Sequence, residues 1–344
     1  ANLNAPFRII YSREARKKIR AVLDDFQPDV VHLNNIQYHL TPSIILEINK
    51  WRKETKKECR IVYTTHDYQL VCPSHGMFDV NMKPCERCLD GHYIHCLQTK
   101  CLKNSRAKSL LGTLDGYMWK YSKAYSYVDA YICCSFFLKS KLDTQKRFRD
   151  KTIGLHNFKK EMPHLDNIQK KGYVLEFGHL SRDKGTDTLL EVAKKMPNTE
   201  FVFIGYGPSV DKMKDIPNVK YLGFKTGEEL YRIIAEAAIS VCPSEWYENC
   251  PYSVMESVLL GTPVVGSKMG GIPELIEPGK TGELFEAGNV EDLMKAIKKV
   301  LQTQDVLERY TKNCSQVNYE TTESYYIKLM KIYRGEKNVE QISS

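Results

Sequence analysis

The sequence of 344 residues lacks any long hydrophobic run, and no segment approaches the roughly 20 apolar residues that a membrane-spanning helix needs. Its first residues also lack a basic segment followed by an apolar one, so we expect no secretion signal and a cytoplasmic protein. Because the chain starts with Ala1 rather than Met, we expect that part of the natural N-terminus is missing. With 42% hydrophobic and 27% charged residues, the composition is that of a globular protein and not of a disordered or fibrous one.

Motifs typical of several other protein classes are also missing. Gly205-Tyr206-Gly207 lacks the third glycine of G-x-G-x-x-G, which argues against a nicotinamide-dependent dehydrogenase. The sequence contains no aromatic-interleaved basic motif, so we expect no nucleic-acid partner. It also contains no D-x-D pair, which could hold Mg²⁺ or Mn²⁺ on a diphosphate. We therefore expect chemistry that is independent of a catalytic metal.

Positive charge is abundant, but it is concentrated in the first half of the chain. Residues 1–150 contain 25 Lys+Arg against 15 Asp+Glu, whereas residues 151–344 contain 25 against 27, which gives the net charge of +8. These charges can simply be solvated helix faces. The alternative is attraction to a diphosphate-linked acceptor or to anionic phospholipid, with peripheral association at the inner face of the cell membrane.

Short β-branched runs alternate with longer amphipathic stretches, which is typical of parallel sheets covered by helices. In the first half, strands are expected at 29–33, 60–65, 130–134 and 151–155. In the second half, they are expected at 173–178, 200–205, 219–222, 239–242, 263–266 and 283–285. The second set suits a complete doubly wound domain, whereas the first is short of strands. We therefore expect an α/β protein whose N-terminal domain is truncated.

Three parts follow from this pattern. Residues 1–158 are expected to form an N-terminal Rossmann-like domain, interrupted by a cysteine-rich insertion at 66–104. Residues 159–319 are expected to form a C-terminal Rossmann-like domain, and residues 320–344 a C-terminal helix.

The segment from Glu248 to Glu256 is the most informative part of the sequence, because it follows a strand and opens a helix. Pro251 suits the first turn of that helix, where free backbone N–H groups can hold a phosphate. Glu256 is suited to accept hydrogen bonds from two ribose hydroxyls, and Glu248 to contact a sugar. By spacing alone, however, the two residues are more simply explained as solvated acids.

This segment resembles the E-x7-E motif of retaining glycosyltransferases of family 4, and its surroundings do as well. Downstream, Leu260 to Gly266 and Gly270 to Glu274 follow that family's pattern. Upstream, Phe177 to Gly185 and Ile204 to Pro208 resemble its glycine-rich strand ends. The resemblance covers nearly all of residues 60–335 in the right order and spacing.

The resemblance implies a GT-B architecture, in which two Rossmann-like doubly wound domains face each other across a cleft. The C-terminal domain would hold the nucleotide and the N-terminal domain the acceptor, and the final helix would cross back to the first domain. The implied activity is transfer of a sugar, with retention, from a nucleotide-diphosphate donor to a glycan or lipid-linked acceptor. Synthesis of a surface polysaccharide or glycolipid is the implied process.

The resemblance also implies roles for individual residues. The catalytic pair is His66 and Glu248; the diphosphate would be bound by Arg182, Lys184, Ser253 and Val254, the ribose by Glu256, and the sugar by Asn249 and Cys250. His179 stands where the family has an arginine, and Arg182 is close enough in sequence to replace it. Base recognition is expected near Phe224.

Eleven cysteines are present, and five of them fall within 30 residues in the insertion. The C-x2-C pair of Cys85 and Cys88, with further cysteines nearby, predicts a structural zinc site, with free thiols as the alternative. Some family-4 glycosyltransferases resemble this stretch closely. On that basis the expected zinc ligands are Cys72, Cys85, Cys88 and Cys101, with Cys96 or His95 as substitutes.

Two other functions stay open at this point. One is a non-catalytic nucleotide-sugar-binding or zinc-stapled scaffold protein, which would bind nucleotide without turnover. The other is a sugar-nucleotide epimerase of the same architecture, which would interconvert donors without an acceptor.

Overall fold

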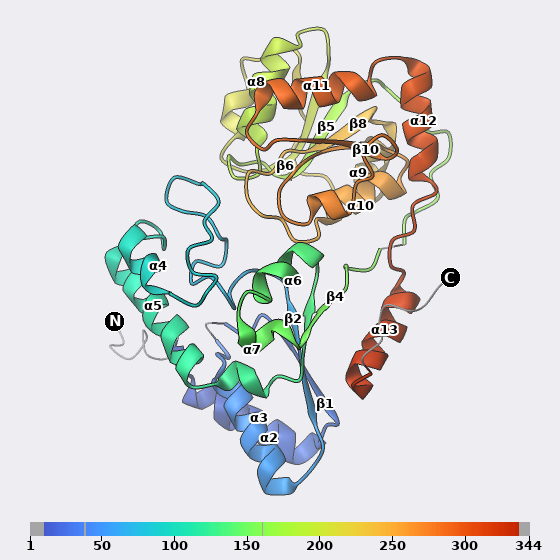
Figure 1. Ribbon diagram of the computed structural model, residues 1–344. Helices are drawn as coiled ribbons and strands as arrows, with labels where there is room; N and C mark the ends of the chain where they lie inside the picture. Colours follow the sequence, from blue (N-terminus) through green and yellow to red (C-terminus); the bar gives the residue numbers. More distant parts are fainter. Residues whose placement is uncertain (1–9, 38, 160, 337–344) are drawn as a thin grey trace. The chain divides into compact units, whose positions relative to one another are not determined.

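The computed structural model describes residues 10–37, 39–159 and 161–336, and it divides into two compact units (Figure 1). Unit 1 consists of residues 1–156 together with residues 323–344, and unit 2 of residues 157–322. The expectation about a missing N-terminus rests in part on Ala1, which lies outside the described residues.

Unit 2 is built on a six-stranded parallel sheet with the order β10-β9-β8-β5-β6-β7. Its strands are β5 (Val174–His179), β6 (Phe201–Tyr206), β7 (Val219–Tyr221), β8 (Ile239–Cys242), β9 (Val264–Ser267) and β10 (Gly282–Phe285). Its helices are α8 (Thr186–Lys195), α9 (Gly227–Glu236), α10 (Tyr252–Leu259), α11 (Val290–Val300) and α12 (Gln304–Cys314). The chain winds outward from β5 in one direction and then from β8 in the other, so the strand order reverses between these two strands. Such a switch point is where open α/β sheets bind ligands.

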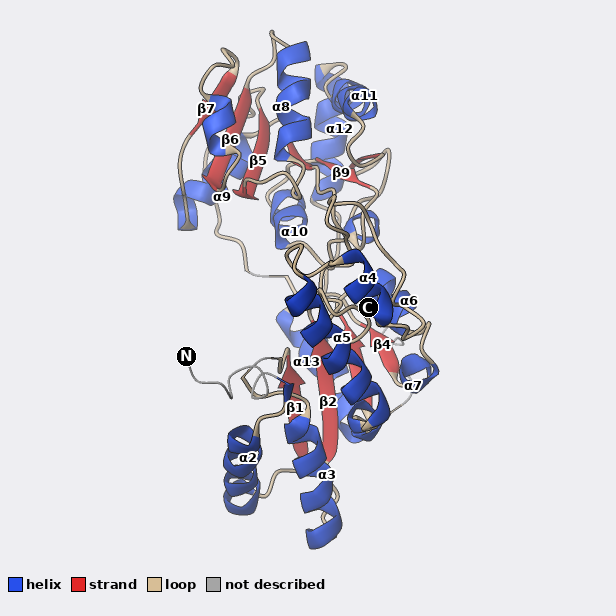
Figure 2. Cartoon of the chain, turned by 90° about the vertical axis from the view of Figure 1, so that its left-hand side faces the viewer, coloured by secondary structure: helices blue, strands red, loops and turns tan. Residues whose placement is uncertain are grey.

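Successive side chains along the strands of unit 2 point to opposite faces of the sheet, and a hydrophobic core lies on each face. Val174 packs into a cluster with Leu189 of α8 and Ile297 of α11, whereas Leu175 packs on the opposite face with Ile234 of α9. Figure 2 shows helices on both faces of this sheet. The doubly wound architecture predicted for the second half of the sequence is therefore present.

Unit 1 contains a four-stranded parallel sheet with the order β1-β2-β3-β4. The strands are β1 (Val30–Asn34), β2 (Arg60–Thr65), β3 (Ala130–Cys133) and β4 (Thr152–Gly154). The helices are α2 (Arg13–Phe26), α3 (Ser43–Thr55), α4 (Ile94–Thr99), α5 (Arg106–Tyr121), α6 (Phe136–Leu142) and α7 (Lys146–Arg149). The last helix, α13 (Thr322–Arg334), buries Ile332 against Val62 and Ile132 of this sheet.

Local sequence explains where several of these helices begin. Ser12 caps α2 by accepting a hydrogen bond from the Ala15 N–H at 3.1 Å, and Asn289 caps α11 through the Asp292 N–H at the same distance. Asx and hydroxyl side chains satisfy N–H groups that a helix start leaves unpaired. None of the described helices has the length and apolar character required to cross a membrane.

The α/β fold with two Rossmann-like parallel sheets is therefore confirmed. Observed strand ends coincide with the predicted ones or differ from them by one residue. The insertion at 66–104 contains α4 and an isolated antiparallel bridge between Phe78 and Pro84, and otherwise consists of turns and loops.

Candidate functional site

A cavity of about 300 Å³ lies in unit 2 at the carboxyl ends of β5 and β8, beside the first turn of α10. The end of β5 contributes Glu176 to His179, the loop after β8 contributes Ser244 and Glu248, and α10 contributes Ser253 and Glu256. The cavity therefore forms at the switch point of the sheet, where parallel strand ends and a helix start converge.

Lys184 and Glu248 form the charged centre of this cavity. The Lys184 ammonium donates to Glu248 Oε1 at 2.6 Å, and Ser244 Oγ donates to the same oxygen at 2.7 Å. The Lys184 ammonium also lies 4.3 Å from the ring centroid of Trp246. Lys184 and Glu248 are only 26% and 14% exposed, so their attraction is less screened than that of a surface pair.

Gly270 and Gly271 hold the loop that carries Glu248. The Gly271 N–H donates to the Glu248 carbonyl at 2.7 Å. Gly270 has φ of +62°, and a Cβ atom at this position would lie 2.0 Å from the same carbonyl oxygen. A side chain is excluded there by both strain and space, which explains why the loop needs glycine at this point.

Glu256 lies on α10 and is 9% exposed, with its side chain at the cavity. Ser253 in the first turn of the helix also lines the cavity, so the helix start faces the space where a ligand would lie. Val254 differs, because its side chain is fully buried and its N–H donates to the Pro251 carbonyl at 3.2 Å.

Some residues of the predicted donor site do not line this cavity. Arg182 is exposed, and neither it nor Asn249 is among the described lining residues. Cys250 is buried, with its thiol 3.9 Å from the Met255 sulfur. His179 lines the cavity, at the position where the family resembled by the sequence has an arginine.

In unit 1, His66 lies directly after β2 and bonds to residues at the ends of the neighbouring strands. His66 Nε2 is 2.9 Å from Asn34 Oδ1, at the end of β1, and Nδ1 is 3.7 Å from the Cys134 thiol, after β3. An amide oxygen only accepts, so Nε2 carries the ring proton in this arrangement. Burial lowers the pKa of His66, which keeps the imidazole neutral near pH 7.

Three residues near His66 and Asp67 were not predicted from the sequence, namely Asn34, Cys134 and His75. Asn34 and Cys134 contact His66 itself, and Asp67 lies 3.9 Å from His75. Asn34 and Cys134 had a usable signal, because side chains at the carboxyl ends of parallel strands gather at one edge of a sheet. His75 had none, since it lies in the irregular insertion.

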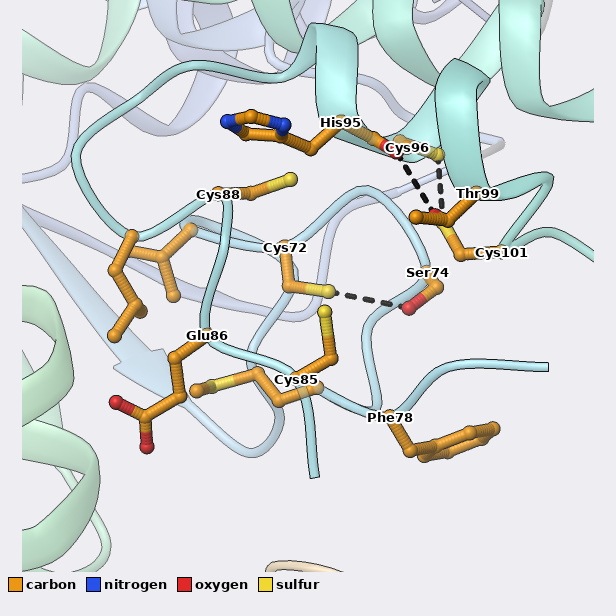
Figure 3. Close-up of a pocket in the computed structure, with 13 residues that line it drawn as sticks. Cys72, Ser74, Phe78, Cys85, Glu86, Cys88, His95, Cys96, Thr99 and Cys101 are labelled. Atoms are coloured by element: carbon orange, nitrogen blue, oxygen red, sulfur yellow. Dashed lines mark hydrogen bonds between the residues drawn. The ribbon is translucent and has the colours of Figure 1, made fainter. Parts of the chain in front are cut away.

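Five cysteines of the insertion line one small pocket in unit 1 (Figure 3). The Cys101 thiol donates to Cys96 Sγ at 2.8 Å, and the Cys72 thiol is 3.1 Å from the Ser74 hydroxyl. Burial raises the pKa of Cys88 to about 12. All five thiols are free and none forms a disulfide.

The predicted zinc site is not supported by this arrangement. Among the residues that the structure describes, no group of three or more His, Cys, Asp or Glu side chains is placed so that it could hold a metal ion. Cys101 is paired with Cys96, and Cys72 with Ser74, whereas a structural zinc site needs four ligands that converge tetrahedrally. The C-x2-C spacing predicted that the thiols lie close together, and they do line one pocket. It did not predict the directions in which the thiols point.

Comparison with known proteins shows a family to which the domain that contains the cavity is similar. Residues 157–317, just under half of the chain, match the family model of glycosyl transferases group 1. Unit 2 is therefore similar to the domains of this family.

Several proteins resemble the chain in sequence. Sulfoquinovosyl transferase SQD2 of Arabidopsis thaliana is 33% identical over 146 residues, which cover 40% of this chain and 28% of that protein. The amylovoran biosynthesis glycosyltransferase AmsK of Erwinia amylovora is 30% identical over 44% of this chain and 41% of that protein. An uncharacterized 42.6 kDa protein from the cps region of Klebsiella pneumoniae is 24% identical over 77% and 64%. The matches thus span less than two thirds of each of these relatives.

Similar solved structures share the fold over most of the chain. Sucrose-phosphate synthase from Thermosynechococcus elongatus superposes with a TM-score of 0.67 at 17% identity, covering 93% of this chain and 76% of that one. Anabaena HepE in complex with UDP superposes with a TM-score of 0.64 at 15% identity, covering 93% and 82%. At such identities the likeness shows the fold, which is that of GT-B glycosyltransferases.

Proposed function

We propose that this protein is a retaining glycosyltransferase that transfers a sugar from a nucleotide-diphosphate donor to a glycan or lipid-linked acceptor. The observation that carries the proposal is the cavity of unit 2, where Lys184, Glu248, Ser253 and Glu256 meet at the switch point of the sheet. The relatives include an amylovoran biosynthesis glycosyltransferase and a sulfoquinovosyl transferase, and on this basis we propose synthesis of a surface polysaccharide or glycolipid.

The donor is proposed to bind in this cavity through its nucleoside diphosphate. The ammonium of Lys184 suits the diphosphate, the carboxylate of Glu256 suits two ribose hydroxyls, and the start of α10 adds backbone N–H groups near Ser253. In the described state Glu248 compensates the charge of Lys184 at 2.6 Å. A diphosphate would compete for that ammonium, so Glu248 would be released toward the sugar. The UDP complexes of similar folds support a nucleoside diphosphate as the ligand.

The chemistry proposed for unit 2 is electrostatic. As the bond between the anomeric carbon and the diphosphate of the donor breaks, negative charge grows on the departing diphosphate. Lys184 together with the helix start would stabilise this charge. Arg182 is the proposed second cation, although it would have to move from its exposed position. Asn249 and Cys250 remain proposed sugar contacts through their backbone, since Cys250 is buried.

Unit 1 is proposed to bind the acceptor. His66 is neutral and its Nε2–H donates a hydrogen bond to Asn34 Oδ1, so we assign it the contact with a sugar or acceptor hydroxyl near the reacting centre. Orientation of that hydroxyl would supply much of the remaining rate enhancement. The positive excess of residues 1–150 supports an anionic acceptor and peripheral association with an anionic membrane surface.

Nucleotide binding by the Glu256→Ala variant is the test of this function. UDP, GDP, ADP and CMP are titrated in a thermal-shift assay, with Glu228→Ala as the matched control because Glu228 is exposed on α9. A nucleotide present at about 100 times its Kd stabilises the native state by roughly 2.7 kcal/mol. We expect one nucleoside diphosphate to raise the Tm of the wild type and the control, but not that of Glu256→Ala.

Two results would contradict the proposal. An equal shift in Glu256→Ala and the wild type would remove Glu256 from the nucleotide site. Nucleotide binding without sugar transfer to any acceptor would instead favour the non-catalytic scaffold.

A further inference from the structure

A second cavity lies in unit 1, where it is lined by the first half of α5 and by the cysteine-rich insertion. Its volume is about 410 Å³, within the range of about 300–1,000 Å³ that is usual for ligand pockets. Gly112 on α5 forms part of the wall, and a Cβ atom there would lie 2.4 Å from a methyl group of Leu102. The apolar side chains of the wall are Ile10, Pro73, Leu102 and Leu111. The cavity is therefore a ligand-sized space whose wall is largely hydrocarbon.

The charged residues of this cavity give it an excess of positive charge. Lys103 and Lys108 line it near the N-terminal end of α5, and both are exposed. Within the described part of the chain, neither lysine takes part in an ion pair. Asp115 is the one acid among the described lining residues, and its Oδ1 accepts a hydrogen bond from the Trp119 indole N–H at 2.8 Å. Two lysines against one acid favour an anionic ligand.

The apolar wall continues onto the outer surface of α5. Leu110, Leu111 and Leu114 are 44%, 38% and 50% exposed, and residues at such spacing share one side of a helix. Exposed apolar side chains that gather in one place mark interaction sites. Leucines beside two lysines suit a ligand that has both a hydrocarbon part and an anionic group. A second copy of the chain fits less well, because a two-fold interface would bring the same lysines of both copies together.

The cavity also adjoins the residues that are proposed to contact the acceptor. His75 lines the cavity, and its Nδ1 is 3.9 Å from Asp67 Oδ2. Asp67 directly follows His66 in the chain. The insertion therefore begins at the histidine assigned to the acceptor and then supplies part of the cavity wall. A ligand in this cavity would lie beside the proposed acceptor region of unit 1.

We propose that this cavity binds the lipid phosphate part of the acceptor. The hydrocarbon chain would lie against Leu102 and Leu111, and the phosphate beside Lys103 and Lys108. The assignment selects the lipid-linked class from the two acceptor classes that the proposed function leaves open, because a free glycan offers neither a hydrocarbon chain nor a phosphate. It rests on the proposed function, since only sugar transfer makes the bound molecule an acceptor.

The experiment is a calorimetric titration of the full chain with octyl phosphate, a single-chain lipid phosphate, kept below the concentration at which it forms micelles. We expect it to bind about tenfold more tightly than hexyl phosphate, because each buried CH₂ group strengthens binding about fourfold at most. 1-Octanol lacks the charged group and inorganic phosphate lacks the chain. Each should bind at least about tenfold more weakly than octyl phosphate.

Two variants with matched controls locate the binding site. Leu111→Asp places a charge in the apolar wall and should weaken octyl phosphate binding at least about tenfold. Leu110→Asp is its control, since Leu110 is as exposed on the same helix but is not among the described lining residues. Combined Lys103→Ala and Lys108→Ala should also weaken binding at least about tenfold, whereas Lys17→Ala, at an exposed position of α2, should not. Each variant should keep its UDP affinity within about twofold, which shows that it is folded.

Three results would overturn the assignment. If Leu110→Asp weakened binding as much as Leu111→Asp, the outer face of α5 would bind, as expected for docking on a membrane surface. If neither Leu111→Asp nor the double lysine variant weakened binding, octyl phosphate would bind elsewhere. A wild-type dimer that Leu111→Asp abolishes would show that a second copy covers this wall.

The same titrations separate this assignment from the proposed function. If UDP binds and octyl phosphate does not, only the lipid assignment is wrong. If octyl phosphate binds as expected but no nucleoside diphosphate does, the proposed function fails, and the cavity is a lipid phosphate site without a role in sugar transfer.

Discussion

The two units share a parallel-sheet design, yet they hold their polar side chains in different ways. In unit 2 the central groups are charged and paired, with Lys184 on Glu248 at 2.6 Å in a cavity at the switch point. In unit 1 the central groups are neutral, with His66 bonded to the amide oxygen of Asn34. A charged cavity suits an anionic ligand held in one position, whereas neutral donors and acceptors suit hydroxyl groups. The comparison therefore supports a division of labour between a donor unit and an acceptor unit.

Removing the charge of Lys184 is the largest change expected from this comparison. Lys184→Ala should weaken UDP binding by roughly 100-fold, because each hydrogen bond to a charged group contributes about 1.5–3 kcal/mol. Calorimetric titration measures the effect. Lys194→Ala is the matched control, since Lys194 is exposed and its ion pair among the described residues is with Glu191 on its own helix.

His66→Ala sharpens the same comparison from the other unit. UDP affinity should stay within about twofold of the wild type, whereas sugar transfer should fall at least about tenfold because the acceptor hydroxyl loses its orientation. If His66→Ala weakened UDP binding as much as Lys184→Ala does, the division between the units would be wrong.

A smaller effect is expected from the backbone that holds Glu248. Gly270→Ala would bring a Cβ atom 2.0 Å from the Glu248 carbonyl and should destabilise unit 2 by about 2–4 kcal/mol, through strain and overpacking. Gly279→Ala is the matched control, because Gly279 has φ of +79° with no atom within 4 Å of its Cβ position. It should cost only the strain of about 1–2 kcal/mol. Urea unfolding of both variants tests this, and equal losses would show that the contact with Glu248 is unimportant.

The smallest predicted effect, taken per pH unit, is a pH dependence that belongs to unit 2. Folding raises the pKa of Glu176 from its ordinary value of 4.5 to about 8, so its contribution to stability is greatest below the unfolded pKa and is lost as the pH rises to about 8. Between about pH 5 and pH 8, wild type should lose about 1.4 kcal/mol per pH unit relative to Glu176→Gln. The measurement is the free energy of the unfolding transition that shifts when nucleotide is added, because that transition belongs to unit 2. Parallel curves for the two proteins would mean that Glu176 is ionised in the folded state.

The sequence could predict the cavity of unit 2 in part because several of its parts are local in the chain. Glu248, Ser253 and Glu256 lie within nine residues, on a strand, loop and helix start whose order the sequence already indicates. Glu176 could not be found in this way, because an acid within a strand gives no sign of whether it is buried. Its neighbour Thr186 is ten residues away, and only the packing of α8 on β5 brings the two together.

The cysteine-rich insertion is a second region for which the sequence predicted only part of the arrangement. The spacing of Cys85 and Cys88 correctly indicated that several thiols share one place in the fold. It could not indicate that Cys101 turns to Cys96 and Cys72 to Ser74, since side-chain directions in a loop depend on contacts distant in the sequence.

The sequence by itself determined the alternation of strands and helices, the two parallel sheets and the segment around Glu248 and Glu256. It did so because hydrophobic periodicity, caps and turns act over short stretches of chain. Only the tertiary structure decided that β5 and β8 are neighbours, that Asn34 contacts His66, and that Oε2 of Glu176 is buried with no hydrogen-bond partner among the described residues. These facts depend on strand order and on packing between segments far apart in sequence, where burial fixes both the partners and the charge of each group.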